Sequence, residues 1–170
     1  GDPIPNVTSD SKWRNLSTGA RCTHGNSASN GETYGFLYNW YAVNDSRGLA
    51  PEGWHIASDE DWKQLEIYLG MSRSEADADG WRGTNEGDKL KETGTSHWKI
   101  SNTGATDVVG FRALPGGHRS YGNGYYYVLG DLAYFWSSSE DGSGNAWYRD
   151  LRYNDSDVGR GNYDKRYGFS

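Results

Sequence analysis

The sequence has little cysteine, few aliphatic residues and no long apolar run. Cys22 is the single cysteine among 170 residues, so the chain forms no internal disulfide and no thiolate zinc site. No apolar stretch approaches the roughly 20 residues that span a bilayer. Lys and Arg form no runs and the net charge is −6, whereas nucleic-acid binding requires a basic surface. We therefore expect neither nucleic acid nor membrane insertion among its partners.

The sequence also lacks the short motifs that mark common catalytic and cofactor sites. It has no Gly-x-Ser-x-Gly elbow, no phosphate-binding Gly-rich loop and no dinucleotide fingerprint. The four His residues lack metal-ligand spacing; we interpret His55 as a partly buried structural residue and His118 as a candidate for a recognition face. Glu140 and Asp141 form an acid pair, which surface turn charges explain better than glycoside hydrolysis. We expect a non-enzymatic protein without a cofactor.

Aromatic residues are what the chain has in excess. Hydrophobic residues make up only 34%, a share that alone would indicate disorder, but there are 8 Trp and 13 Tyr. Large aromatic side chains bury enough surface to anchor a core, and 24 Gly supply turns. The length suits one globular domain, so we expect residues 1–170 to fold as a single domain.

Residues 58–70 carry the clearest helix pattern. Ser58 and Asp61 have the spacing of a capping box, Trp62 and Leu69 share one helical face, and Gly70 provides a stop. Residues 74–79 predict a second, short helix. Elsewhere we expect an extended arm over residues 1–33, a buried element over 35–43 that is either strand or helix, and a short strand over 54–57.

The last third changes to short β-like runs bounded by Gly, Asn, Asp or Ser. Strands are predicted over residues 110–114, 133–137 and 146–151. Trp81, Leu90 and Trp98 are the expected anchors in the polar stretch that precedes them. The chain therefore predicts an α+β fold whose C-terminal end is a meander of short strands.

Several blocks of the sequence resemble a known family and occur in that family's order. These blocks are residues 35–45 (GFLYNWYAVND), 48–56 (GLAPEGWHI), 61–62 (DW), 113–117 (ALPGG), 135–140 (FWSSSE), 145–149 (NAWYR) and 167–170 (YGFS). Together they resemble the Fibrobacter succinogenes major paralogous domain. The resemblance implies a C-type-lectin-like α+β domain, related to the formylglycine-generating-enzyme fold, with small antiparallel sheets and one or two helices. It also implies a bacterial extracellular setting. The paired active cysteines of the formylglycine-generating branch have no counterpart beside Cys22.

Residues 117–170 show a second pattern between the fixed blocks. The intervals are filled with Tyr, Asp, Ser, Gly and Arg, all of which a codon for Asn can become when its adenines change. This resembles the variable region of a diversity-generating-retroelement target, a class of receptor-binding proteins on phage virions or cell surfaces. The resemblance implies a protein or glycan receptor on a cell surface as the partner.

Nine of the thirteen Tyr lie in this region, and Tyr with Ser, Gly and Asn is the composition of antibody paratopes. Three consecutive Tyr cannot all face one core, although Tyr also favours strands for structural reasons alone. Trp136, Trp147, Phe135 and Phe169 are expected to hold the core. The predicted ligand-binding residues are Tyr121, Tyr125, Tyr126, Tyr127, Asp131, Tyr134, Asp150, Arg152, Tyr153, Asp155, Asp157, Arg160, Tyr163, Asp164, Arg166 and Tyr167.

Alternatives stay open at this point. Residues 155–159 share the spacing of a Ca²⁺ loop but lack its later Gly and Glu, so a solvated loop is favoured and calcium remains a lesser alternative. A fixed extracellular carbohydrate-binding or adhesion module would use the same aromatic residues without variation. A hydrolase on the same fold would need a pocket with perturbed carboxylates.

Overall fold

A computed structural model describes residues 3–142 and 144–170. Its helices are α1 (Asp10–Trp13), α2 (Ala28–Tyr34), α3 (Trp40–Val43), α4 (Asp59–Leu69), α5 (Arg73–Asp77) and α6 (Glu86–Leu90), with a 3-10 turn, η1 (His24–Asn26). Its strands are β1 (Arg21–Cys22), β2 (Leu37–Tyr38), β3 (Gly80–Arg82), β4 (His118–Arg119), β5 (Tyr126–Tyr127), β6 (Leu132–Asp141), β7 (Asn145–Arg152) and β8 (Val158–Asp164). The fold is α+β, as expected, with few helices and small antiparallel sheets.

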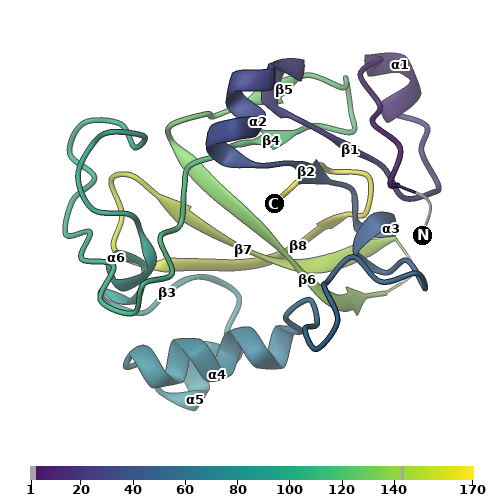
Figure 1. The fold of residues 1–170 in the computed structure, drawn as a ribbon. Coiled ribbons are helices and arrows are strands. Elements are labelled where there is room, and N and C mark those ends of the chain that lie inside the picture. The colour runs from purple at the N-terminus through teal and green to yellow at the C-terminus, as the bar shows by residue number, and fades with distance from the viewer. Residues whose placement is uncertain (1–2, 143) are drawn as a thin grey trace.

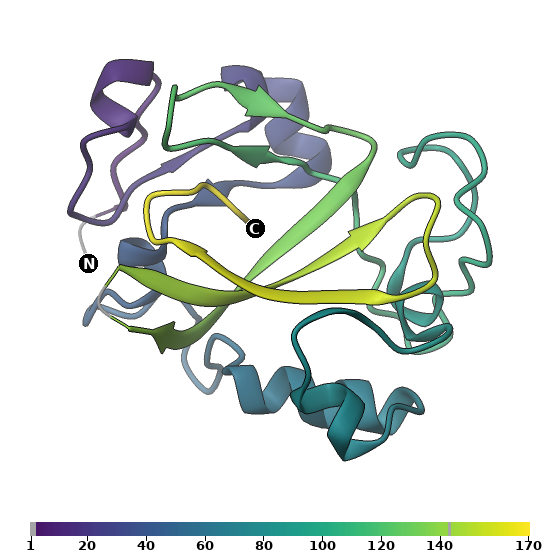
Figure 2. The same cartoon turned by 180° about the vertical axis from the view of Figure 1, so that it is seen from behind.

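One four-stranded antiparallel sheet crosses the middle of the molecule, with the strand order β3-β8-β7-β6. Helices α4 and α5 lie on one side of this sheet (Figure 1). The two-stranded sheets β1-β2 and β4-β5, together with α2, lie on the other side, as the reverse view also shows (Figure 2). The sheet therefore has two faces in different surroundings.

Helix α4 forms where the sequence predicts it. The Ser58 side chain accepts a hydrogen bond from the Asp61 backbone N–H, and the Asp61 carboxylate accepts one from the Ser58 N–H, so the capping box is present. Gly70 ends the helix with a φ of 134°, a conformation that favours glycine. The second predicted helix is also confirmed, as α5.

The first third of the chain differs from its prediction. Described residues of the expected 1–33 arm form α1, η1 and α2 as well as β1. Segment 35–43, for which strand and helix stayed open, contains both β2 and α3. Asn39 makes this switch, because its side chain accepts a hydrogen bond from the Ala42 N–H and so caps α3.

Two predicted strands are wrong. Residues 54–57 form a loop, in which Trp54 is 77% exposed and Ala57 offers one carbonyl to the Ser138 N–H. Residues 110–114 form only an isolated bridge at Ala113, because Arg112 adopts a φ of 52° and leaves the extended conformation. The Asp107 carboxylate accepts a hydrogen bond from the Arg112 N–H at 2.7 Å, which holds that bend.

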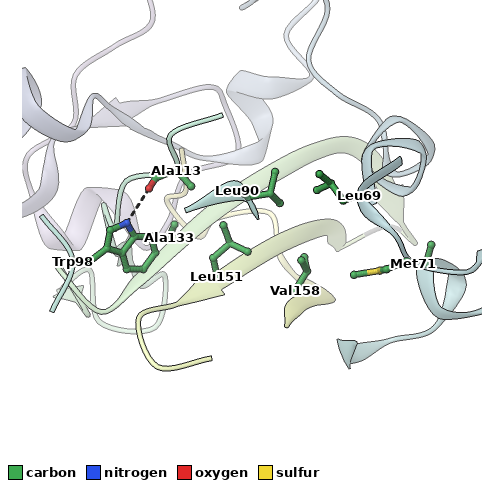
Figure 3. Packing of buried hydrophobic residues seen from close by; sticks show 9 residues of the cluster. Leu69, Met71, Leu90, Trp98, Ala113, Ala133, Leu151 and Val158 are labelled. Atoms are coloured by element: carbon green, nitrogen blue, oxygen red, sulfur yellow. Dashed lines mark hydrogen bonds between the residues drawn. The ribbon is translucent and has the colours of Figure 1, made fainter. Parts of the chain in front are cut away.

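The largest apolar cluster lies between the four-stranded sheet and the segment that contains helices α4 to α6 (Figure 3). Leu69, Leu90, Leu151 and Val158 meet there, and the Trp98 indole N–H donates to the Ala113 carbonyl. Leu90 and Trp98 are thus the anchors that the sequence predicts. A second cluster collects Trp40, Trp136, Ala146 and Phe169 on the other face of the sheet, and a third gathers Trp13, Ala20, Cys22 and Leu37.

Trp81 is not a core anchor. It lies on β3 opposite Gly159 and remains 36% exposed. Of the other expected core residues, Trp136 and Phe169 are buried, whereas Phe135 and Trp147 are half-buried. The Arg160 guanidinium covers the Trp147 ring at 3.8 Å from its centroid.

Candidate functional site

Side chains along β7 alternate between the two faces of the sheet, as the period of two requires. Arg149 and Leu151 point toward α4, where they contact Glu66 and the main core. Tyr148, Asp150 and Arg152 point the other way and line a hollow. The strand predicted over residues 146–151 is confirmed as part of β7, and its two faces have different surroundings.

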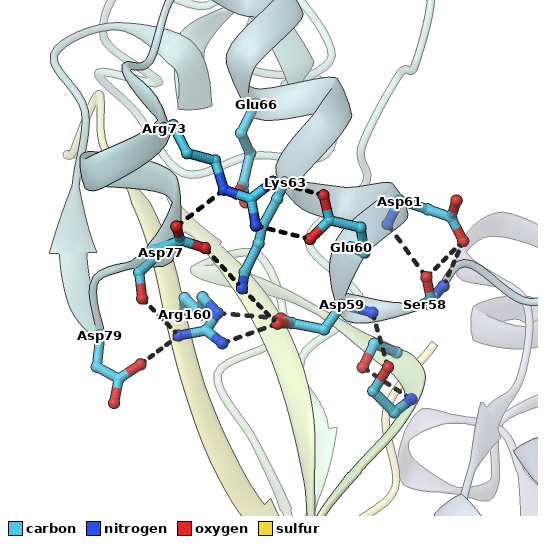
Figure 4. Close-up of polar contacts among 12 residues, drawn as sticks. Ser58, Asp59, Glu60, Asp61, Lys63, Glu66, Arg73, Asp77, Asp79 and Arg160 are labelled. Atoms are coloured by element: carbon cyan, nitrogen blue, oxygen red, sulfur yellow. Dashed lines mark hydrogen bonds and ion pairs between the residues drawn. The ribbon is translucent and has the colours of Figure 1, made fainter.

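The face toward α4 is an ion-pair network, which we call the ionic face; it comprises Arg82, Arg149 and Arg160 from the sheet with Asp59 and Glu66 from α4. Figure 4 shows the part of this network in which Arg160 meets Asp59. Glu66 and the Arg149 side chain are fully buried. Arg149 Nε donates to Glu66 Oε1 at 2.6 Å, and Arg82 Nη2 donates to Glu66 Oε2 at 2.6 Å. Asp59 accepts hydrogen bonds from both Arg149 and Arg160, with 2.7 Å between Arg160 Nη2 and Asp59 Oδ2. Each buried carboxylate is paired with two guanidinium groups.

The ionic face explains the position of Arg160. Burial disfavours the charged form of Asp59, but hydrogen bonds from Arg160 and the charge of Arg149 outweigh burial and hold the pKa of that carboxyl below its usual range. Arg160 also forms an ion pair with Asp79, and only 6% of its surface is exposed. Its guanidinium therefore bonds residues of the ionic face, while Arg160 also lines a hollow on the opposite face, so its assignment as a ligand-binding residue stays a prediction.

The opposite face carries a row of stacked aromatic rings, which we call the tyrosine face. Tyr148 and Tyr163 stack with 4.7 Å between centroids and 3° between planes. Tyr163 stacks in turn on Tyr167 at 4.8 Å, and Tyr134 stacks on the buried Phe169 at 4.8 Å. Offset stacking of this kind fixes the ring orientations, so the row is rigid before any ligand binds.

His118 joins the tyrosine face to strand β5. Its ring stacks on Tyr127 at 5.5 Å and meets Tyr134 edge-on at 5.0 Å. Burial, with a smaller contribution from His24, lowers the pKa of His118 to about 4. The imidazole is therefore neutral near pH 7 and behaves as one more ring of the face, which is the position that the sequence suggested for it.

A hollow of about 180 Å³ opens in the tyrosine face between β3, β8 and β7. Asp150 lies in it with only 5% of its surface exposed, and the hydroxyl-bearing rings of Tyr134, Tyr148 and Tyr163 also line it. Burial raises the pKa of Asp150 to about 7, against the opposing charges of Arg152 and Arg82. Burial followed by the negative charge of Asp150 also raises the pKa values of Tyr134 and Tyr148, so both phenols keep their protons.

Glycine makes room for this carboxylate. A Cβ atom built on Gly159 would lie 1.9 Å from Asp150 Oδ1, so any larger residue would displace the carboxylate. Arg152 lies at the rim, with its guanidinium 4.3 Å above the centroid of the Trp81 ring. The hollow therefore combines a buried acid, two arginines, Arg152 and Arg160, of which Arg152 is exposed, and several hydroxyl groups.

Two further predicted residues extend the same face. The Tyr121 ring meets Tyr167 edge-on at 5.2 Å, and the Arg166 guanidinium lies 4.4 Å from the Tyr121 centroid. Asp164 holds Arg166 in place through two charge-assisted hydrogen bonds of 2.8 and 2.6 Å. Eight predicted residues thus gather around the row of rings: Tyr121, Tyr134, Asp150, Arg152, Tyr163, Asp164, Arg166 and Tyr167.

The remaining predicted residues lie at other places. Tyr125 is exposed on the approach to β5, whereas the Tyr126 hydroxyl donates to Asn26 and its ring lies against Arg119. Asp131 forms an ion pair with Lys99, whose Nζ lies 5.8 Å from the centroid of the Tyr153 ring. Asp131 and Tyr153 therefore lie together, at a different edge of the sheet from the hollow.

Asp155 and Asp157 lie in the β7–β8 loop beside α6. The Asp155 carboxylate accepts a hydrogen bond from the Asp157 N–H at 3.1 Å, and the Asp155 carbonyl accepts one from Lys91 Nζ at 2.8 Å. Among residues 3–142 and 144–170, no group of three or more His, Cys, Asp or Glu side chains is placed to hold a metal ion.

Sequence reasoning missed Tyr148 and Trp81 as members of the tyrosine face. Tyr148 was assigned to a fixed block, although it has the same strand parity as Asp150 and Arg152 and so faces the same way. Trp81 was assigned to the core. His55 also differs from its prediction: it is exposed, not partly buried, and bonds Asp61 at 3.1 Å.

None of the helices in the described part of the chain has the length and apolar character needed to cross a bilayer. The fold and the face define an α+β protein in which a small antiparallel sheet is fixed by ion pairs on one side and presents stacked rings on the other. The family model of the Fibrobacter succinogenes major domain matches residues 1–170, and the chain belongs to that family. No curated protein and no solved structure matches it significantly.

Proposed function

We propose that the protein is a non-enzymatic ligand-binding domain that recognises a protein or glycan receptor through the tyrosine face. The observation that carries this proposal is the stacked row of Tyr148, Tyr163 and Tyr167 beside an acid and a base. Tyr gives a large contact area at a small cost in conformational entropy, and stacking lowers that cost further. The ring faces and hydroxyl groups supply apolar and polar contacts together.

The finer part of the proposal concerns variation. We propose a C-type-lectin-like fold and a role as a diversity-generating-retroelement variable protein, displayed outside the cell or on a phage virion. The ionic face supports this, because the ion pairs of Glu66 with Arg82 and Arg149 lie on the side of the sheet opposite to the stacked rings. Substitutions at Tyr163 or Arg152 would leave those buried ion pairs intact.

A fixed carbohydrate-binding or adhesion module is the alternative, and the same rings support it. The hydrolase alternative has one supporting observation, the raised pKa of Asp150 in a hollow. Glycoside hydrolysis by the common route requires two carboxyl groups flanking the bond, and Asp150 is the one carboxylate among the described lining residues. Release of product from aryl glycosides, lost on Asp150→Asn, would contradict a non-enzymatic role.

The first prediction tests the tyrosine face directly. Tyr163→Ala removes the ring that joins Tyr148 to Tyr167, so binding to the receptor or glycan identified by array screening should weaken at least about tenfold, the loss expected for a Tyr hot spot. Tyr68→Ala is the matched control, because Tyr68 lies on α4 and is 79% exposed. Biolayer interferometry with both variants measures the difference. Equal affinity of Tyr163→Ala and wild type would contradict the proposal.

A further inference from the structure

The Asp150 carboxylate is buried without a hydrogen-bond donor. Only 5% of Asp150 is exposed, and no described residue donates a hydrogen bond to its carboxylate. The carboxylate lines the hollow, so water or a ligand in the hollow is the remaining source of hydrogen-bond donors for it. Buried polar groups are nearly always satisfied, so a ligand that enters the hollow with donor groups can replace that water and bond the carboxylate.

The neighbouring charges restrict what that ligand can be. Arg152 stands at the rim and Arg82 lies on the other side of the sheet, and both attract the carboxylate without bonding it. Asp155 is the negative group that opposes them. A cationic ligand would be placed beside Arg152, whereas an anionic one would be placed against Asp150. A neutral ligand that carries O–H donors avoids both repulsions.

The rest of the lining matches a neutral polyol. Tyr134, Tyr148 and Tyr163 have hydroxyl groups that can donate and accept, and Arg152 can donate to a ring or hydroxyl oxygen. Trp81 offers a partly exposed aromatic surface at the rim, against which a flat apolar face can lie. The hollow of about 180 Å³ suits a single sugar ring and not a longer chain.

We propose that this hollow binds one neutral sugar residue, whose hydroxyl groups donate hydrogen bonds to the Asp150 carboxylate while Arg152 and the Tyr hydroxyls bond the remaining oxygens. The proposal rests on the proposed function and narrows its ligand to a glycan with a neutral sugar. Gly159 is the residue that keeps the carboxylate accessible to it.

The test uses glucose, galactose, mannose and N-acetylglucosamine as probes, with glucuronate and methylammonium for comparison. Amide chemical shifts of the full chain are followed during titration. At least one neutral sugar should shift the amides of Asp150 and Gly159, and Asp150→Asn should weaken its binding by about tenfold or more, since a hydrogen bond to a charged group is lost. Asp141→Asn, outside the hollow, should bind as wild type does.

Other results would overturn the proposal. Saturable binding of methylammonium or glucuronate in place of every neutral sugar would assign the hollow to a charged group. No shift with any neutral sugar would mean that the hollow is not a sugar site. In that event the Tyr163→Ala variant still tests the proposed function. If this variant binds the receptor more weakly than wild type, only the sugar proposal fails. If its affinity for the receptor is unchanged, both proposals fail.

Discussion

Burial shifts the pKa values of two residues of the tyrosine face, Asp150 and His118, in the direction that favours their neutral forms. Burial raises the pKa of Asp150 to about 7 and lowers the pKa of His118 to about 4. A shift of pKa between the folded and unfolded chain makes stability depend on pH. The two shifts change stability in opposite directions as the pH rises, so a variant of each residue tests them separately.

Asp150→Asn tests the acid. The folded pKa is raised, so the stabilising contribution of the proton is complete below about pH 4 and is lost as the pH rises through about 7. The stability of Asp150→Asn relative to wild type should therefore increase by about 2 to 4 kcal/mol between about pH 4 and pH 8. Urea unfolding across that range measures it, with Asp141→Asn as the control. A pH-independent difference would show that Asp150 is not desolvated.

His118→Phe tests the imidazole. The folded pKa is lowered, so wild type keeps its full stability above about pH 6.5 and loses it as the pH falls through about 4. A phenyl ring fits among Tyr127, Tyr134 and Tyr167 and does not titrate. As the pH falls from about 6.5 to about 4, the free energy of unfolding of the variant should rise by about 2 to 3 kcal/mol relative to that of wild type, as measured by thermal or urea unfolding. Parallel pH profiles of the two proteins would contradict the burial of a neutral His118.

At the scale of the elements, α4 is attached to the sheet largely through charge. Glu66→Ala would leave Arg82 and Arg149 buried without their shared partner, and removing one member of a buried pair costs about 3 to 5 kcal/mol. Glu60→Ala is the matched control on the same helix, because its pair with Arg73 is exposed and should contribute less than about 1 kcal/mol. Similar losses for the two variants in urea unfolding would contradict the account of the ionic face.

The elements also show what sequence can predict. The capping box at Ser58 and Asp61 and the strand over residues 146–151 follow from local patterns, and the sequence predicts both. The bend at Arg112 depends on a bond from Asp107, and the burial of Arg160 depends on Asp59, about a hundred residues away in the chain. Contacts of that kind leave no local pattern, so the sequence did not predict the ion pair between Arg160 and Asp59.

At the scale of the whole molecule, the two faces of one sheet have different surroundings and, in our proposal, different roles. The ionic face is buried and its carboxylates are paired with guanidinium groups, while the tyrosine face is supported from beneath by Phe169 and Trp136 and exposes its outer rings. Tyr163 is 39% exposed, whereas Glu66 is not exposed at all. A protein that varies its ligand needs this separation between the residues that fold the sheet and those that bind.

Sequencing the DNA for residues 117–170 in sibling copies, with its flanking region, tests that separation most directly. We predict adenine-directed changes at positions such as Arg152, Tyr163 and Tyr167, beside a near-identical template copy, with Arg149 and the other residues of the ionic face unchanged. An invariant segment without a template, or changes spread equally over both faces, would contradict the account and favour a fixed adhesion or glycan-binding module.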